Sequence, residues 1–234
     1  MIEILPTNTC PPDARELVLH SEAFSKFAPH IQLDIADGIF VPTLSWPYKA
    51  GQWLELEHLA RKKNALPFSD ALFYEAHLMV DTPEVVGELL ARAGCRRILA
   101  HVEVFADDDS VRNAFSRWKK AGASEVGLVL LIDTPLSILD HLVSECDAVQ
   151  LMSIAVLGAQ GAAFDSRVIS RIAELHARYP KLLIAIDGGV SEKNIAELVQ
   201  AGARRFGVGS AISKSADPAE AYKHIQELAE SALY

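Results

Sequence analysis

The chain has 234 residues, of which half are hydrophobic, and its 22 Lys and Arg against 31 Asp and Glu leave a formal net charge of -9. This length suits one large α/β domain or two small ones. The counts of 13 glycines and 11 prolines are ordinary and exclude collagen-like and low-complexity chains. Because the acid excess would repel a phosphate backbone, we expect no nucleic-acid partner.

Apolar runs such as 126–132 are far shorter than the roughly 20 residues that a membrane helix needs. The first residues show no basic segment followed by an apolar one, so no secretory signal is expected. The cysteines Cys10, Cys95 and Cys146 have no Cys-x-x-Cys spacing. We therefore expect reduced thiols, a cytoplasmic location and no membrane partner.

Short apolar runs alternate along the chain with longer segments of helical spacing, a pattern typical of a parallel α/β fold. The expected strands are Glu3–Leu5, Ile31–Ile35, Phe73–His77, Arg97–His101, Gly127–Leu131, Ala148–Met152, Leu182–Ile186 and Arg205–Val208. The expected helices are Ala14–Phe27, Gly51–Lys62, Pro83–Ala93, Ser110–Ala121, Pro135–Ser144, Ser166–Arg178, Glu192–Ala201 and Ala219–Ala229.

Cap residues mark several of these helices. Thr82, Thr134 and Ser191 are N-cap candidates, and the expected C-caps are Gly94, Gly122 and Gly202. The eight strand-helix units average roughly 29 residues, which is close to the compact limit of a (β/α)8 TIM barrel. We expect one barrel domain over residues 1–234, with an open doubly wound sheet as the structural alternative.

In barrels of this class, chemistry lies at the carboxyl ends of the strands. The residues at these ends are Thr7, Asp34, His77, His101, Leu131, Ser153, Asp187 and Gly209. A carboxylate that ends an apolar strand requires a proton, a cation or a metal. Either aspartate alone could form a structural ion pair or a helix cap, but Asp34, His77 and Asp187 together favour a functional site.

Glycines follow the last two expected strands. Gly188 and Gly189 end one strand and Gly209 with Ser210 ends the next, where barrels place a phosphate site. Plain tight turns are the alternative. The loop 157–161, which contains Gly158, follows the sixth strand and could cover the same ligand.

Several motifs carry a resemblance to the ribulose-phosphate 3-epimerase family. They are Leu33-Asp34-Ile35-Ala36-Asp37-Gly38-Ile39-Phe40-Val41-Pro42, Ala76-His77-Leu78-Met79-Val80, His101-Val102-Glu103, Thr134-Pro135-Leu136, Met152-Ser153, Ile186-Asp187-Gly188-Gly189 and Gly209-Ser210-Ala211-Ile212. The similarity runs over essentially the whole chain, and the order of these motifs makes it specific.

The resemblance implies a TIM barrel of the ribulose-phosphate-binding type that epimerises a ketopentose phosphate at C3. Asp34 and Asp187 would be the acid/base pair on opposite faces of the substrate, since a single base would return the proton to its original face. Asp34, His77 and Asp187 would bind a divalent metal such as Zn, Mn, Fe or Co. The other expected substrate and phosphate contacts are Thr7, His77, Met79, Gly158, Gly188, Gly189, Gly209 and Ser210.

The chain departs from the family pattern at the same pocket. Gln32 stands where the family has a metal-binding His, so metal affinity should fall or shift toward a harder ion. Ala36 replaces a methionine and is expected to widen the pocket. Leu131-Ile132 replaces Asn-Pro, Thr7 replaces a serine, and 155–161 replaces the family's phosphate-binding loop. These changes suggest an altered substrate, an altered metal or lost activity.

Three functions therefore remain open: an active ketose-phosphate 3-epimerase, a non-catalytic phosphosugar-binding barrel derived from it, and a decarboxylase or aldolase on the same barrel. The last is disfavoured because 34–37 lacks the lysine of the Asp-x-Lys-x-x-Asp motif. His101 and Glu103 fit a structural role as well as a catalytic one, and Met79 fits core packing as well as the pocket floor. The family resemblance also makes a homo-oligomer plausible.

Overall fold

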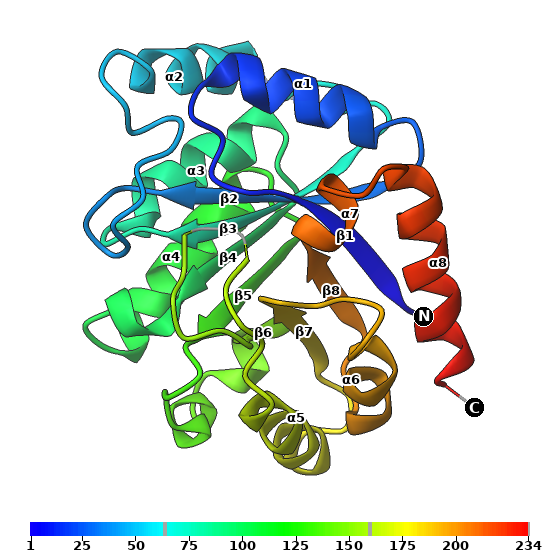
Figure 1. Ribbon diagram of the computed structural model, residues 1–234. Helices are drawn as coiled ribbons and strands as arrows, with labels where there is room; N and C mark the ends of the chain where they lie inside the picture. The colour runs from blue at the N-terminus through cyan, green and yellow to red at the C-terminus, as the bar shows by residue number, and fades with distance from the viewer. Residues whose placement is uncertain (63–64, 159–160, 234) are drawn as a thin grey trace.

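The computed structural model describes residues 1–62, 65–158 and 161–233. Eight parallel strands pair in chain order and close into a barrel when β8 pairs with β1 (Figure 1). The strands are β1 (Glu3–Asn8), β2 (His30–Ala36), β3 (Phe73–Met79), β4 (Arg97–His101), β5 (Glu125–Leu130), β6 (Ala148–Met152), β7 (Leu183–Asp187) and β8 (Arg205–Val208). The predicted (β/α)8 barrel is confirmed, and the open-sheet alternative is wrong.

Helices surround the barrel, and α8 packs beside β1, so that the described chain ends near its start (Figure 1). The helices are α1 (Ala14–Phe24), α2 (Trp53–Lys62), α3 (Pro83–Ala93), α4 (Asp108–Ala121), α5 (Arg167–Arg178), α6 (Ile195–Ala201), α7 (Ser210–Ser213) and α8 (Pro218–Ser231). None that the structure describes is long and apolar enough to cross a membrane.

The predicted helix Pro135–Ser144 is wrong. Two short 3-10 helices, η2 (Leu136–Leu139) and η3 (Val143–Glu145), occupy the segment instead. Its start is held by side-chain contacts, because the Thr134 hydroxyl and the Leu131 N–H both donate to the carboxylate of Glu103. A hydroxyl used in this way does not cap a helix, so Thr134 is not the N-cap that its position predicted.

The remaining cap predictions differ in outcome. Gly94, Gly122 and Gly202 end α3, α4 and α6 with φ of 109°, 128° and 123°, as expected of glycine C-caps. Thr82 occupies the N-cap of α3, although its side chain makes no capping hydrogen bond. Ser191 is not an N-cap, because α6 starts later and Asn194 holds that position.

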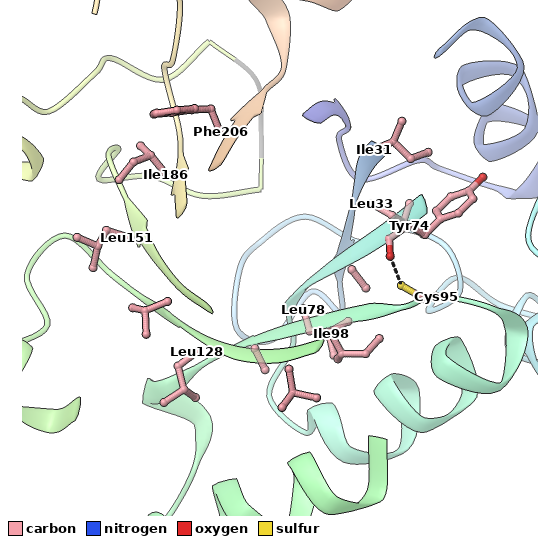
Figure 2. Close-up of a cluster of buried hydrophobic side chains, with 14 of the residues drawn as sticks. Ile31, Leu33, Tyr74, Leu78, Cys95, Ile98, Leu128, Leu151, Ile186 and Phe206 are labelled. Carbon is pink, nitrogen blue, oxygen red and sulfur yellow. Dashed lines mark hydrogen bonds between the residues drawn. The ribbon is translucent and has the colours of Figure 1, made fainter. Parts of the chain in front are cut away.

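Side chains alternate along each strand between two environments. Those facing the helices form the main apolar core, and Figure 2 shows the labelled strand residues spread around the outer face of the barrel. Cys95, just before β4, donates from Sγ to the carbonyls of Tyr74 and Arg97. All three cysteines are free thiols, as expected. The side chains that face the barrel interior include many polar groups. They form ion pairs at the amino-terminal end of the barrel and include Asp34, His77 and Asp187 at the carboxyl-terminal end.

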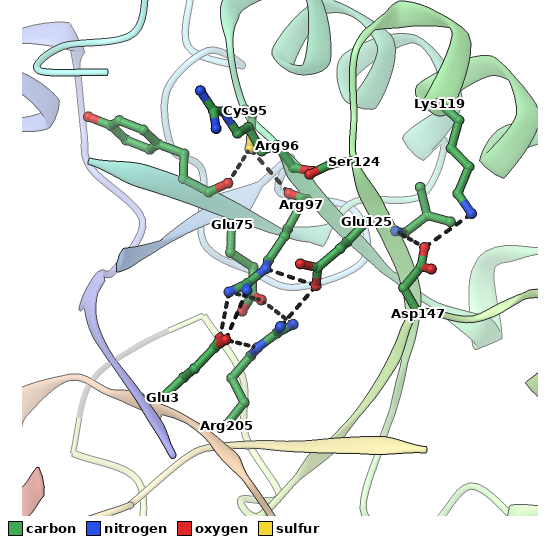
Figure 3. A network of polar contacts seen from close by, with 12 residues as sticks. Glu3, Glu75, Cys95, Arg96, Arg97, Lys119, Ser124, Glu125, Asp147 and Arg205 are labelled. Atoms are coloured by element: carbon green, nitrogen blue, oxygen red, sulfur yellow. Dashed lines mark hydrogen bonds and ion pairs between the residues drawn. The ribbon is translucent and has the colours of Figure 1, made fainter. Parts of the chain in front are cut away.

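The amino-terminal end of the barrel is closed by an ion-pair network (Figure 3). Arg205 on β8 lies 2.8 Å from Glu3, 3.1 Å from Glu75 and 2.9 Å from Glu125. Arg97 on β4 adds a 2.7 Å contact to Glu3. Because Glu75 is fully buried, its charge depends on these guanidinium groups. The network therefore leaves the opposite end of the barrel for ligand binding.

Candidate active site

A cavity opens at the carboxyl ends of the strands, where the sequence places its candidate residues. Its lining includes Thr7, Asp34, Met79, Gly158, Asp187, Gly188, Gly189, Gly209 and Ser210. Of the predicted substrate contacts, only His77 is not part of the lining. It is fully buried and lies behind the two aspartates.

Asp34 and Asp187 converge on one imidazole nitrogen. Strand register places Asp34 beside His77, and Asp187 approaches from β7 on the other side. Nδ1 of His77 is 3.3 Å from Oδ1 of Asp34 and 3.3 Å from Oδ2 of Asp187. That nitrogen is buried and forms no hydrogen bond of good geometry within the described chain. The three side chains thus point their polar atoms toward a common centre.

Burial and charge shift the protonation of this group. Burial raises the pKa of Asp34, and the nearby Asp187 carboxylate adds to this effect against the opposing influence of His77 and of the hydrogen bond from Gln32. Burial alone would lower the pKa of His77, but the Asp187 and Asp34 carboxylates outweigh it and raise that pKa to about 9. The two carboxylates therefore stabilise the protonated form of His77 at neutral pH.

Gln32 occupies the position next to Asp34 on the inner face of β2. Its Nε2 donates to Oδ1 of Asp34 over 3.0 Å, while its Oε1 is buried without a described partner. The amide is oriented by this contact, because the reverse orientation would place two oxygens together. Gly207 provides the space, since a Cβ there would lie 2.9 Å from Gln32 Oε1 and 3.0 Å from Asp187 Oδ1. We did not single out Gly207 from the sequence, although glycine inside a strand is a signal of close approach.

A chain of hydrogen bonds leads away from the cavity behind His77. Nε2 of His77 is 3.0 Å from Nε2 of His101, and Nδ1 of His101 is 3.2 Å from Oε2 of Glu103. Phe40 covers His101 with ring centroids 4.6 Å apart. Burial lowers the pKa of His101 to about 4 despite its contact with Glu103. His101 is thus a neutral ring between the site and the half-buried carboxylate of Glu103.

The end of β7 is shaped by glycines and by Ser153. The Ser153 hydroxyl donates to the carbonyls of Asp187 and Gly188, which fixes the turn that follows the catalytic candidate. Gly188 and Gly189 have φ of 112° and 66°, and a Cβ on Gly188 would lie 2.7 Å from Ile154. These two positions therefore require glycine for conformational and steric reasons.

Loops after β2 and β6 meet over the cavity. Asp37 accepts the N–H groups of Ile39, Phe40 and Asp81, which fixes the loop after β2. From that loop Thr43 donates to the carbonyl of Gly158 over 2.7 Å. Ala159 and Gln160 of the predicted phosphate loop lie outside the described residues.

The structure corrects the expectation that Ala36 widens the pocket. Ala36 is fully buried in an apolar cluster with Val41, Met79, Leu99, Val129, Met152, Ile154 and Leu157, and it does not line the cavity. Neighbouring side chains therefore occupy the space next to the small alanine. Met79 belongs to this cluster and also lines the cavity, so both sequence interpretations of that residue hold.

The donor set fits a divalent metal. Ligand atoms of Asp34, His77 and Asp187 all lie within 4.8 Å of one another. One imidazole nitrogen and two carboxylates suit Zn, Mn, Fe and Co. The unpartnered Nδ1 of His77, directed at both carboxylates, is the observation that supports this fit. Gln32 presents its amide N–H to Asp34, so it is not positioned as a fourth ligand in this arrangement.

Sequence comparisons give a consistent group of relatives. The family model described as the ribulose-phosphate 3 epimerase family matches residues 13–213. The chain is 33% identical over 207 residues to ribulose-phosphate 3-epimerase of Aquifex aeolicus, which covers 87% of this chain and 86% of that protein. It is 28% identical over 204 residues to the cytoplasmic isoform of ribulose-phosphate 3-epimerase from Oryza sativa subsp. japonica, covering 86% and 82%.

Solved structures show the same fold at low sequence identity. A 3-hexulose-6-phosphate synthase from Salmonella typhimurium aligns with a TM-score of 0.70 and 18% identity, covering 99% of this chain and 100% of that one. Orotidine 5'-phosphate decarboxylase from Pyrococcus horikoshii aligns with a TM-score of 0.61 and 19% identity, covering 98% and 99%. At this identity the likeness concerns the barrel fold alone.

Proposed function

Since the chain belongs to the ribulose-phosphate 3-epimerase family, we propose that it inverts C3 of a ketopentose phosphate such as ribulose 5-phosphate by proton transfer between Asp34 and Asp187. These carboxylates come from β2 and β7, which are separated around the barrel by β8 and β1. Both line the cavity, so a substrate carbon between them is accessible to a base on one side and an acid on the other.

The protonation of the pair suits this chemistry. One carboxylate removes the C3 proton, and the electron pair moves to the adjacent carbonyl to form an enediolate. The other carboxyl group, in its protonated form, then donates its proton to the opposite face of C3. Burial beside a second carboxylate favours the neutral form of Asp34, so the site holds an acid and a base together.

Substrate binding would rest on the turns after β7 and β8. Backbone N–H groups near Gly188, Gly189, Gly209 and Ser210 would bind the phosphate, and Thr7, Met79 and Gly158 would contact the sugar. Binding through the phosphate holds the reacting carbon between the aspartates. Asp34, His77 and Asp187 would hold the divalent metal, which when bound supplies positive charge for the enediolate oxygens.

The observation that carries the proposal is the convergence of Asp34 and Asp187 on Nδ1 of His77 at the floor of a glycine-walled cavity. The test is incubation with ribulose 5-phosphate in heavy water, with NMR detection of deuterium at C3. Asp34→Asn and Asp187→Asn should each lower conversion of the substrate to its C3 epimer, followed in the same spectra, by about 100- to 10,000-fold. Asp109→Asn, which removes an exposed carboxylate, serves as the matched control and should exchange normally. Absence of exchange in the unmodified protein with added Zn, Mn, Fe or Co would reject the proposal.

The contact between Gln32 and Asp34 favours a second candidate, a non-catalytic phosphosugar-binding barrel. An amide that donates a hydrogen bond to a carboxylate oxygen lowers the basicity of Asp34 and the affinity of that oxygen for a metal. Calorimetry should then detect ribulose 5-phosphate binding while the same protein incorporates no deuterium at C3. Exchange above the Asp187→Asn background would rule this candidate out.

We also propose a cytoplasmic location and assembly into a homo-oligomer. The first is supported by the similarity to the rice isoform named cytoplasmic, and the second by the family resemblance. Fluorescent tagging in cells and size-exclusion chromatography with light scattering test these two statements.

A further inference from the structure

His101 and Glu103 lie behind His77 and are not among the residues that line the cavity. We propose that His101 and Glu103 are positioning residues that hold one proton of His77 on Nε2, so that Nδ1, the nitrogen facing Asp34 and Asp187, is the one left to bind a cation. The inference rests on the proposed function in one respect only: the metal that this nitrogen would bind.

The carboxylate of Glu103 determines which atoms donate in the hydrogen bonds from Glu103 through His101 to His77. Its Oε1 accepts the Leu131 N–H over 2.8 Å and the Thr134 hydroxyl, and its Oε2 faces Nδ1 of His101 at 3.2 Å. A carboxylate that receives two donors from the chain acts as an acceptor toward the third partner as well. Nδ1 of His101 must therefore carry the proton.

The second step follows from the chemistry of a neutral imidazole. When Nδ1 carries the only ring proton, Nε2 is an acceptor. Nε2 of His101 is 3.0 Å from Nε2 of His77, so His77 donates its Nε2 proton into this bond. Phe40 packs against His101, and the rings of His77 and His101 are both fully buried, so bulk solvent does not reach their contact.

The third step concerns the site itself. A His77 ring that keeps one proton on Nε2 can bind a cation only through Nδ1, the atom 3.3 Å from each aspartate, once the proton on Nδ1 is displaced. Metal-binding histidines are commonly oriented by a carboxylate on their other nitrogen, and here the carboxylate acts through a second histidine. Glu103 thus determines which ring nitrogen of His77 is available to a cation, although it contacts His77 only through His101.

Glu103→Gln tests this relay without changing side-chain size. An amide can satisfy the Leu131 and Thr134 donors with its oxygen only if its NH2 group faces His101. That would place the proton of His101 on Nε2, make Nε2 of His77 an acceptor and put its remaining proton on Nδ1. We expect Glu103→Gln to weaken Zn binding by about 10- to 100-fold in calorimetry. Thr134→Val, which removes a donor from the same carboxylate but keeps the acceptor, should bind Zn within about twofold of the unmodified protein.

The imidazole tautomers provide a readout independent of activity. In the metal-free, unmodified protein, nitrogen-15 NMR at neutral pH should show the His101 proton on Nδ1. In Glu103→Gln it should move to Nε2. A His101 proton on Nε2 in the unmodified protein would overturn the proposal, as would equal Zn affinity of Glu103→Gln and Thr134→Val. Neither measurement uses a sugar phosphate, so failure of C3 exchange and failure of the relay are separate results.

Discussion

Nε2 of Gln32 donates a hydrogen bond over 3.0 Å to Oδ1 of Asp34, the same oxygen that lies 3.3 Å from Nδ1 of His77. Gln32 and His77 therefore both approach the same oxygen of Asp34 at the centre of the site. The family resemblance implies a histidine at this position, which would offer a metal its imidazole where Gln32 instead engages Asp34. We therefore expect Gln32 to influence metal affinity through Asp34, without being a ligand itself.

Gln32→His should tighten Zn binding by about tenfold or more, because imidazole is a better zinc ligand than an amide and the hydrogen bond to Asp34 is removed. Gln32→Leu is the control, since it removes the amide without adding a ligand. Calorimetric titration of the metal-free proteins measures both. Equal affinities of the His and Leu variants would show that a side chain at this position does not reach the metal.

Metal affinity should also rise with pH. The pKa of His77 is raised to about 9, so below that pH Nδ1 carries a proton that an incoming cation must displace. Loss of one proton implies an increase of about tenfold in affinity per pH unit between about pH 6 and 8.5. Cobalt titration followed by visible absorption, in buffers of different ionisation enthalpy, reports both the slope and the released proton. A flat profile would contradict the assignment of His77 as a ligand.

Gly207→Ala should separate activity from stability. The added Cβ would lie 2.9 Å from Gln32 Oε1 and 3.0 Å from Asp187 Oδ1, so the Gln32 amide must shift and the carboxylate must give by a few tenths of an ångström. We expect C3 exchange to fall, because a displaced reacting group loses its alignment with the substrate.

Gly87→Ala on α3 is the matched control for Gly207→Ala. Its Cβ would clash with the indole of Trp118, far from the cavity, and should cost about 1–3 kcal/mol of stability while exchange is retained. Urea unfolding and the deuterium assay distinguish the two glycine variants. Normal exchange in Gly207→Ala would mean that Asp187 does not need its observed position.

Arg205→Met should lower the free energy of unfolding by about 3–5 kcal/mol, because it leaves Glu75 fully buried with only the 3.9 Å contact to Arg97. Arg112→Met removes a surface ion pair to Asp109 and should cost less than about 1 kcal/mol. Urea unfolding measures both.

The cost of Arg205→Met should shrink as the pH falls. Burial raises the pKa of Glu75 above its value of 4.5 in the unfolded chain, even with its arginine partners present. A raised carboxyl pKa means that the penalty of the buried charge is full above the folded pKa and disappears as the pH falls toward the unfolded value. Comparing unfolding near pH 7 and near pH 5 tests this sign, and a larger loss at the lower pH would contradict it.

Most strand positions follow from local pattern. Arg97–His101, Ala148–Met152 and Arg205–Val208 were predicted with the bounds that the structure has, because short apolar runs bounded by turn residues restrict a strand strongly. The helix expected at Pro135–Ser144 shows the limit of this reasoning. Its spacing is amphipathic, but the Glu103 carboxylate, remote in sequence, binds Leu131 and Thr134 just before the segment.

For the candidate site too, the sequence predicts the residues but not all of their contacts. Asp34, His77 and Asp187 were identified from their places at strand ends and from the family motifs, and the cavity lining includes both aspartates. The relation of His77 to His101 was not predicted. It depends on neighbouring strands, in which the register pairs His77 with Leu99, two residues before His101.

The sequence by itself determined the β/α alternation, the residues at the strand ends and the family. These depend on periodicity and on short motifs, which a linear chain carries without reference to its fold. Only the tertiary structure decided that Gln32 occupies an oxygen of Asp34, that Glu103 reaches His77 through His101, and that Arg205 pairs with Glu3 from 202 residues away. Barrel closure and strand register bring those atoms together, and neither is encoded in the spacing of any one segment.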